Sequence, residues 1–268
     1  MVGPPRDMAV ITLTTDFGSD SPYVAQMKAS IYSLAPQANV VDVTHSIAAQ
    51  DIQQGALVLA DTAFYFPAGT IHVAVVDPGV GTQRAIVAAQ IDEHWFVAPD
   101  NGLLTGVANG REITALRRAE NARLWRHPVS STFHGRDIMA PVAAHLSLGV
   151  APQEIGPSHE DLARIDWPAC EIDEKQITGQ VIFIDSFGNL VTNIFRTDLK
   201  NWQRGRDCTI RCGKHALDNT STTYAARPAG EIVALLGSSE RLEIAVVAGN
   251  AAVKLSVDRG EQVTVTAT

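Results

Sequence analysis

Short apolar runs alternate with longer segments of helical periodicity through the first half of the chain, and this alternation constrains the fold most strongly. The runs are rich in β-branched residues and end at Gly, Pro, Asn or Asp, as strands do. We expect strands at residues 9–14, 39–43, 70–76, 85–90 and 95–98, and helices at residues 23–34, 52–65 and 137–148. This order predicts an α/β N-terminal domain with a mostly parallel sheet covered by helices.

The pattern changes in the second half of the chain. Residues 166–176 contain Pro168 and several charges, and we expect them to form a linker. Short alternating runs follow without long helical periods, at residues 177–184, 209–211, 231–236, 242–247 and 263–266. They predict a smaller all-β, barrel-like C-terminal domain. The expected domains are therefore residues 8–165 and 177–268, on either side of the linker.

Charge and cysteine content exclude several classes of protein. The formal net charge is −8, and a chain without basic tracts is a poor binder of nucleic acid. Its three cysteines are too few for a disulfide framework, and the Cys208–Cys212 pair has no second pair for a zinc site; the third is Cys170. Residues 1–7 have no apolar signal core, and no apolar run approaches the roughly 18 residues of a membrane span. We expect a cytoplasmic protein that does not bind membranes.

Polar residues recur where the predicted strands end, which is where open α/β sheets bind ligands. Asp16 follows the first strand and Asp77 the third, and other polar groups follow the second and fifth, namely Asp42, Thr44, His45, Asp100 and Asn101. The Asp77-Pro78-Gly79 sequence is also typical of a simple turn. Because the loop lacks both the Walker A and the G-x-G-x-x-G spacing, we expect no nucleotide cofactor.

Three further clusters have both a structural and a functional interpretation. His134 lies beside a glycine at the start of a predicted helix, where a histidine can act as a base, and Asp137 suits the first helical turn. Residues 185–189 resemble a hairpin turn, as do residues 237–239 and 249–252. The histidines and carboxylates lack the spacing of known metal motifs, so we expect no metal.

Taken together, seven motifs resemble the S-adenosyl-L-methionine (SAM) hydroxide adenosyltransferases, which are SAM hydrolases related to the fluorinases and chlorinases. They are TTDFG (14–18), DVTH (42–45), VVDPGVGTQR (75–84), APDNGLL (98–104), STFHGRD (131–137), FGNLVTN (187–193), and GSSERLEIA with GNAA (237–245, 249–252). The resemblance runs through almost the whole chain. It implies two domains and a homotrimer, in which SAM binds between one subunit's first domain and its neighbour's second.

The resemblance also implies roles for individual residues. Asp77, Arg84 and His134 would form the hydrolytic set. The halogenases have Tyr in place of this Asp and Tyr-Ser in place of His-Gly, so Asp77 and His134-Gly135 favour water as the nucleophile. The substrate-binding residues would be Asp16 at the ribose, Asp185 and Ser238 at the methionine end, Phe187, Asn189 and Ala251 around the adenine, and Asp20 as the acid near Pro22-Tyr23. Ser21 and Glu240 depart from the family pattern, which affects the methionine end.

The expected reaction is hydrolysis of SAM to adenosine and L-methionine, by in-line attack of water on C5′ of the ribose. Three alternatives remain from the sequence: a SAM-dependent halogenase, a non-catalytic module that binds adenosine or SAM, and a nucleoside-handling enzyme with the same pocket.

Overall fold

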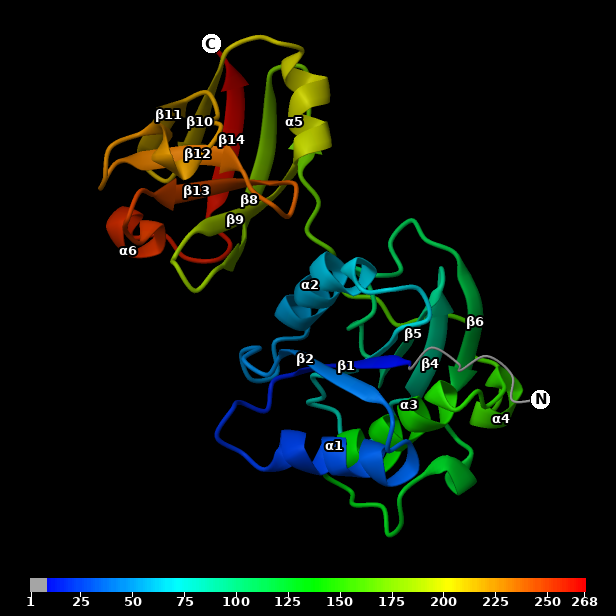
Figure 1. The fold of residues 1–268 in the computed structure, drawn as a ribbon. Helices are drawn as coiled ribbons and strands as arrows, with labels where there is room; N and C mark the ends of the chain where they lie inside the picture. The colour runs from blue at the N-terminus through cyan, green and yellow to red at the C-terminus, as the bar shows by residue number, and fades with distance from the viewer. Residues whose placement is uncertain (1–8) are drawn as a thin grey trace, which may run out of the picture. The chain divides into compact units, whose positions relative to one another are not determined.

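The computed structural model describes residues 9–268, which divide into two compact units with a boundary between Trp167 and Pro168 (Figure 1). This boundary falls within the segment 166–176 that we expected as a linker. Part of that segment forms the short strand β7 (Glu171–Ile172), which pairs with a strand of the second unit.

Within the described residues, the first unit holds a six-stranded sheet in the order β2-β1-β3-β5-β4-β6. The strands are β1 (Val10–Thr15), β2 (Asn39–Thr44), β3 (Ile71–Val75), β4 (Ile86–Ile91), β5 (His94–Pro99) and β6 (Ile113–Arg118). Strands β2, β1, β3 and β5 are parallel neighbours, whereas β4 is antiparallel to both β5 and β6. Only Asp92 and Glu93 separate β4 from β5, and so short a connection requires a hairpin. Strand β6 was not predicted.

Helices cover both faces of this sheet, as the alternation predicts. They are α1 (Tyr23–Leu34), α2 (Ile52–Thr62), α3 (Ala140–Ser147) and α4 (Pro152–Ile155). Alternate residues of β3 point to opposite faces: Val73 and Val75 join the core that contains α1 and α3, whereas Ala74 joins the core that contains α2. The third helical segment begins earlier than expected, as a π-helical turn at Gly135–Met139.

Two buried histidines on neighbouring strands, His72 of β3 and His94 of β5, contact each other. His72 Nδ1 lies 2.8 Å from the Thr12 hydroxyl, and His72 Nε2 lies 3.1 Å from His94 Nδ1. Burial and the charge of His94 lower the pKa of His72 to about 3. The pKa of His94 is also lowered by burial, so both rings pack as neutral groups, away from the carboxyl ends of these strands.

The second unit is an antiparallel, nearly closed barrel-like sheet, so the predicted two-domain fold class is confirmed. Among the described residues its strands run β11-β10-β14-β8-β9-β13-β12, with β7 beside β8. They are β8 (Gln176–Ile184), β9 (Leu190–Phe195), β10 (Cys208–Cys212), β11 (His215–Asp218), β12 (Ile232–Leu236), β13 (Arg241–Val246) and β14 (Gln262–Ala267). The Ser221 N–H donates to the Ala234 carbonyl at 2.7 Å and so connects the two ends of the sheet.

Two short helices of this unit were not predicted. They are α5 (Arg196–Gln203) and α6 (Ala251–Leu255). Helix α5 has eight residues and buries only Leu199 and Trp202, so its apolar pattern is too short to identify a helix from the sequence. Helix α6 begins inside residues 249–252, which we expected to form a turn, and the Asn250 side chain caps it by accepting from the Val253 N–H at 2.8 Å.

No helix in residues 9–268 has the length and apolar character required to cross a membrane.

Candidate active site

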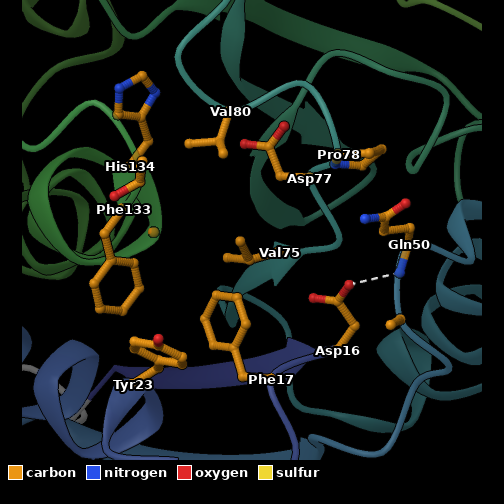
Figure 2. A pocket seen from close by; sticks show the side chains of 13 residues that line it. Asp16, Phe17, Tyr23, Gln50, Val75, Asp77, Pro78, Val80, Phe133 and His134 are labelled. Carbon is orange, nitrogen blue, oxygen red and sulfur yellow. Dashed lines mark hydrogen bonds between the residues drawn. The ribbon is translucent and has the colours of Figure 1, made fainter.

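A cavity of about 380 Å³ opens beyond the carboxyl ends of β1 and β3 in the first unit. Figure 2 shows three groups of side chains around the cavity, and Val75 of β3 lies between these groups. Asp77 and His134 lie on one side, Asp16 and Gln50 on another, and three aromatic rings on the third. The cavity thus lies where an open α/β sheet binds ligands.

Asp77 and Arg84 form a two-point ion pair at the edge of this cavity. Arg84 Nε donates to Asp77 Oδ1 at 2.7 Å, and Arg84 Nη2 donates to Oδ2. Both side chains are largely buried, with 5% of Asp77 and 10% of Arg84 exposed. Such a bidentate pair fixes the plane of the carboxylate and balances its charge. The turn expected from Asp77-Pro78-Gly79 is present, since the Val80 N–H donates to the Asp77 carbonyl.

Arg84 also connects Asp77 to His134. Its Nη2 lies 3.0 Å from His134 Nδ1, and an arginine can only donate, so Nδ1 must accept. The neutral ring therefore carries its proton on Nε2. Burial, and then the charge of Arg84, lowers the pKa of His134. His134 is consequently a neutral group at neutral pH, with an Nε2–H that can donate.

The buried carboxylate of Asp137 holds the segment that carries His134. It accepts from the Ser130 N–H at 2.9 Å, from Arg136 Nε at 2.7 Å and from Arg126 at 3.2 Å. Burial opposes its ionisation, but the hydrogen bonds from Arg136 and Ser130 outweigh burial and lower its pKa. Asp137 does lie in the first helical turn as expected, and it also anchors the loop before that turn.

Glycines allow the two loops of the site to approach closely. Gly81 has a φ of +79°, and a Cβ there would lie 2.5 Å from the Ser131 carbonyl oxygen. A Cβ at Gly79 would lie 3.3 Å from Cγ of Arg84. The absence of side chains at these two positions lets Arg84 turn back to Asp77 and reach His134.

Asp16 faces the same cavity from the end of β1. Its Oδ2 accepts a hydrogen bond from the Gln50 N–H at 2.8 Å (Figure 2). The DVTH segment supports the loop that carries it, because the Gly18 N–H donates to the His45 carbonyl at 2.8 Å and His45 Nδ1 lies 2.9 Å from the Thr15 hydroxyl. Asp20, by contrast, is exposed and accepts from the Ser19 hydroxyl, outside the lining of the cavity.

The remaining predicted substrate residues lie in the second unit. Asp185 organises its own turn: Oδ1 accepts from the N–H groups of Phe187 and Asn189 at 2.9 and 2.8 Å, and Oδ2 accepts from Asn189 Nδ2 at 2.9 Å. Phe187 projects from this turn with 74% of its surface exposed. The expected turn thus forms, and it presents an aromatic ring to its surroundings.

Helix α6 begins against the same turn. The Ala251 N–H donates to the Gly188 carbonyl at 3.1 Å, and Ala251 is fully buried. Gly188 has a φ of +82°, and a Cβ there would lie 2.1 Å from the Asn250 side chain. The FGN and GNAA motifs are therefore packed together, although about sixty residues separate them in the sequence.

Ser238 is exposed on the loop before β13, and a buried carboxylate that sequence reasoning missed lies beside that loop. Glu243 is only 7% exposed and accepts from the Tyr224 hydroxyl at 2.8 Å. Burial raises its pKa, and the negative charge of Asp185 adds to this effect. A Cβ at Gly237 would meet its Oε1, so the carboxylate fills the space under the loop. A charged residue between the apolar residues Leu242 and Ile244 was the available signal.

Sequence reasoning also missed the aromatic side of the first cavity. Phe17 and Phe133 were present in the TTDFG and STFHG motifs, and Tyr23 begins α1, but none was predicted to contact a ligand. Within residues 9–268, no three His, Cys, Asp or Glu side chains are grouped as a metal site would require.

Two sequence profiles match the chain in consecutive segments. Residues 11–156 match the SAM hydroxide adenosyltransferase N-terminal domain, and residues 179–264 match the corresponding C-terminal domain. A solved structure titled as an uncharacterized conserved protein from Thermotoga maritima superposes with a TM-score of 0.90 at 32% identity, covering 96% of this chain and 99% of that one.

Named relatives cover nearly the full length of the chain. An (R)-S-adenosyl-L-methionine hydrolase from Salinispora arenicola is 38% identical over 96% of this chain and 97% of its own length. One from Thermus thermophilus is 37% identical over 94% and 98%. A fluorinase from an Actinoplanes species is more distant, at 29% identity over 98% and 99%. The chain therefore belongs to the SAM hydroxide adenosyltransferase family.

Proposed function

We propose that this protein is an enzyme that hydrolyses SAM to adenosine and L-methionine. The interlocked group of Asp77, Arg84 and His134 beside a cavity that Asp16 also lines is the observation that supports this function most directly. The names of the relatives point to the same substrate, in its (R) form at sulfur.

The reaction is a displacement at C5′ of the ribose. The oxygen of a water molecule forms a bond to C5′ while the C5′–S bond breaks and its electron pair moves to sulfur. The sulfonium leaves as the neutral thioether of methionine, so no general acid is required. The water gives up one proton. Holding water and substrate in line can lower such a barrier by about 7–11 kcal/mol in favourable cases.

The hydrogen bonds of the site suggest how the three residues divide the work. The neutral His134 holds its proton on Nε2 and donates to the water oxygen, which fixes the direction of the attacking lone pair. Asp77 accepts the proton, and assistance by such a base contributes typically about 10² to 10⁴ in rate. Arg84 holds both partners and stabilises the hydroxide character that develops beside it.

Substrate binding would use both domains. Asp16 would bind the ribose hydroxyls and so aim C5′ at the water. Asp185, Phe187, Asn189, Ser238 and Ala251 would contact the adenine and methionine ends, with Asp20 near the entrance. We further propose that the protein is cytoplasmic and, from the resemblance, that it is a homotrimer in which a neighbour's second domain completes each site.

Halogenation is the principal alternative, because fluorinases are relatives of this chain. Asp77 and the His134-Gly135 pair stand where the resemblance gives the halogenases Tyr and Tyr-Ser. The Asp77 carboxylate also disfavours a halide, because an ionised carboxylate can accept a proton from water but offers an anion no hydrogen-bond donor.

The decisive experiment is product analysis in a closed incubation of the enzyme with SAM and excess chloride. We expect adenosine and methionine, without 5′-chloro-5′-deoxyadenosine. Asp77→Ala and His134→Ala should abolish adenosine formation while SAM still binds. The assignment is rejected if the wild-type enzyme leaves SAM intact, or if either variant turns over at the wild-type rate. Adenosine consumption would identify a nucleoside-handling enzyme instead.

A further inference from the structure

Three aromatic rings form one side of the candidate active site, and the chemistry above does not use them. Phe17, Tyr23 and Phe133 pack edge to face, with ring centroids 5.7 Å apart for Phe17–Tyr23, 5.6 Å for Phe17–Phe133 and 5.2 Å for Tyr23–Phe133. We call these three residues the aromatic wall. Figure 2 shows them together, across the pocket from Gln50 and Pro78.

Arg136 contacts the aromatic wall through Phe133. A second hollow of about 470 Å³ shares all three rings, and there the Arg136 guanidinium lies over Phe133, 5.0 Å from its centroid. Arg136 is in turn bound to Asp137 and to Gln26. Mutual edge-to-face packing orients the three rings and this cation adds a contact to Phe133, so the wall presents aromatic surface to the cavity.

The charge of the site leaves the substrate's sulfonium in need of a partner. Asp77 is already balanced by Arg84, and Asp16 is assigned to the ribose. A carboxylate at the sulfur would stabilise the charged ground state more than the transition state, in which sulfur loses its charge, and would slow the reaction. Aromatic rings attract a poorly hydrated cation and also contact a neutral thioether favourably. A ring surface therefore suits sulfur before and after bond breaking.

We propose, on the basis of the proposed function, that the aromatic wall binds the S-methyl sulfonium of SAM and distinguishes the two configurations at sulfur. With the ribose held at Asp16 and C5′ aligned with the water, inversion at sulfur exchanges the positions of the methyl group and the aminobutyrate chain. The wall accepts the small methyl group. In the other epimer it would face the longer, polar chain, whose ammonium and carboxylate groups lose hydration against the rings.

Ligand charge provides the first test. In an Asp77→Asn background, which we expect to prevent turnover, Kd is measured for SAM and for S-adenosylhomocysteine, whose sulfur carries no charge, with and without Phe17→Leu. We expect Phe17→Leu to weaken SAM binding by about three- to tenfold, as expected for loss of a cation–π contact, and S-adenosylhomocysteine binding much less. Equal losses for both ligands would show that the ring only shapes the pocket, and would overturn the proposal.

Three further variants extend this test and control for folding and for the hydroxyl group. Tyr23→Leu tests the same point at a half-exposed position, whereas Tyr23→Phe retains the ring and should behave as the parent protein. Tyr65→Leu removes an aromatic ring that is 82% exposed and outside the cavity, so the ratio of the two Kd values should not change.

Configuration provides the second test. With the active enzyme, kcat/KM is compared for the (R) and (S) epimers of SAM at sulfur. Phe17→Leu and Tyr23→Leu should reduce the ratio of the two values, and an unchanged ratio would show that the wall does not read configuration. If the wild-type enzyme forms adenosine from neither epimer, the proposed function fails, but the binding comparison in the Asp77→Asn background still decides whether the wall recognises the cation.

Discussion

Asp77 and Asp185 are both predicted site carboxylates, yet the two domains hold them in different ways. The partners of Asp185 are N–H groups of its own turn, two and four residues away. The partner of Asp77 is a guanidinium seven residues on, which is shared with a histidine fifty residues farther along the chain. The first arrangement follows from local turn chemistry, whereas the second exists only when two separate loops are packed together.

This difference supports the roles proposed for the two carboxylates, catalysis for Asp77 and substrate binding for Asp185. A turn that satisfies its own carboxylate can present groups to a ligand, but its hydrogen bonds do not connect that carboxylate to a second ionisable side chain. A carboxylate fixed by a cation that also holds a histidine is part of a charge system, and removal of one member changes the others. The predictions below test this difference.

Among changes that leave Asp77 and His134 in place, Arg84→Ala should have the largest effect. It removes the bond to His134 and leaves the Asp77 carboxylate without its partner, so we expect kcat to fall by about 10² to 10³, in the range seen when a preorganised donor is removed. Steady-state kinetics with SAM would measure it, with Arg84→Lys as the matched control that keeps the charge but not the two-point contact. A change confined to KM would contradict the proposed difference between the two carboxylates.

Acidification should have the next largest effect, through His134. Burial and Arg84 lower the pKa of His134 below its usual value of 6.5, so the ring is neutral above that value. As pH falls through the lowered pKa, Nδ1 gains a proton and turns from an acceptor into a donor that faces Arg84. We expect kcat/KM to be constant near neutrality and to fall about tenfold per pH unit below the lowered pKa, as for loss of one essential group. A midpoint above 6.5 would contradict this account of His134.

Asp185→Ala should have the smallest effect on catalysis. Loss of the turn contacts should lower the stability of the second domain by about 1 kcal/mol, which thermal unfolding would measure. Binding should weaken, so that KM rises while kcat is retained. Asp185→Asn keeps an acceptor for the turn and should restore stability before it restores KM. If Asp185→Ala reduces kcat as strongly as Arg84→Ala does, the distinction between the two sites is wrong.

Local patterns predicted most of the secondary structure. Helix α1 has the expected bounds, and the strands around Asp16 and Asp77 were expected from their apolar runs. The errors fall where tertiary contacts decide. Strand β9 was not predicted, although Thr192 is buried there and donates to the Leu242 carbonyl. Strand β4 is antiparallel because of a two-residue connection, which the apolar pattern alone did not reveal.

The site was predictable to a different degree. Strand ends indicated Asp16 and Asp77 from physical reasoning alone, because side chains that follow parallel strands gather at one edge of the sheet. No spacing of residues in the sequence indicated that Arg84 contacts His134. Only the family resemblance placed these two residues in one site. The aromatic wall and Glu243 were missed because the role of an aromatic ring or a buried acid depends on its tertiary contacts. A single sequence does not reveal those contacts.

The close approach of Gly81 to Ser131 has a consequence for redesign of this enzyme. A single hydrogen atom at Gly81 keeps two loops at the separation that Arg84 requires, since even a methyl group would collide with the opposite carbonyl. Exchange of Asp77 or His134 alone would alter the chemistry but leave this separation unchanged. To admit a nucleophile larger than water, a redesign would first have to increase the distance between these two loops. New side chains to line the pocket could be chosen only after that.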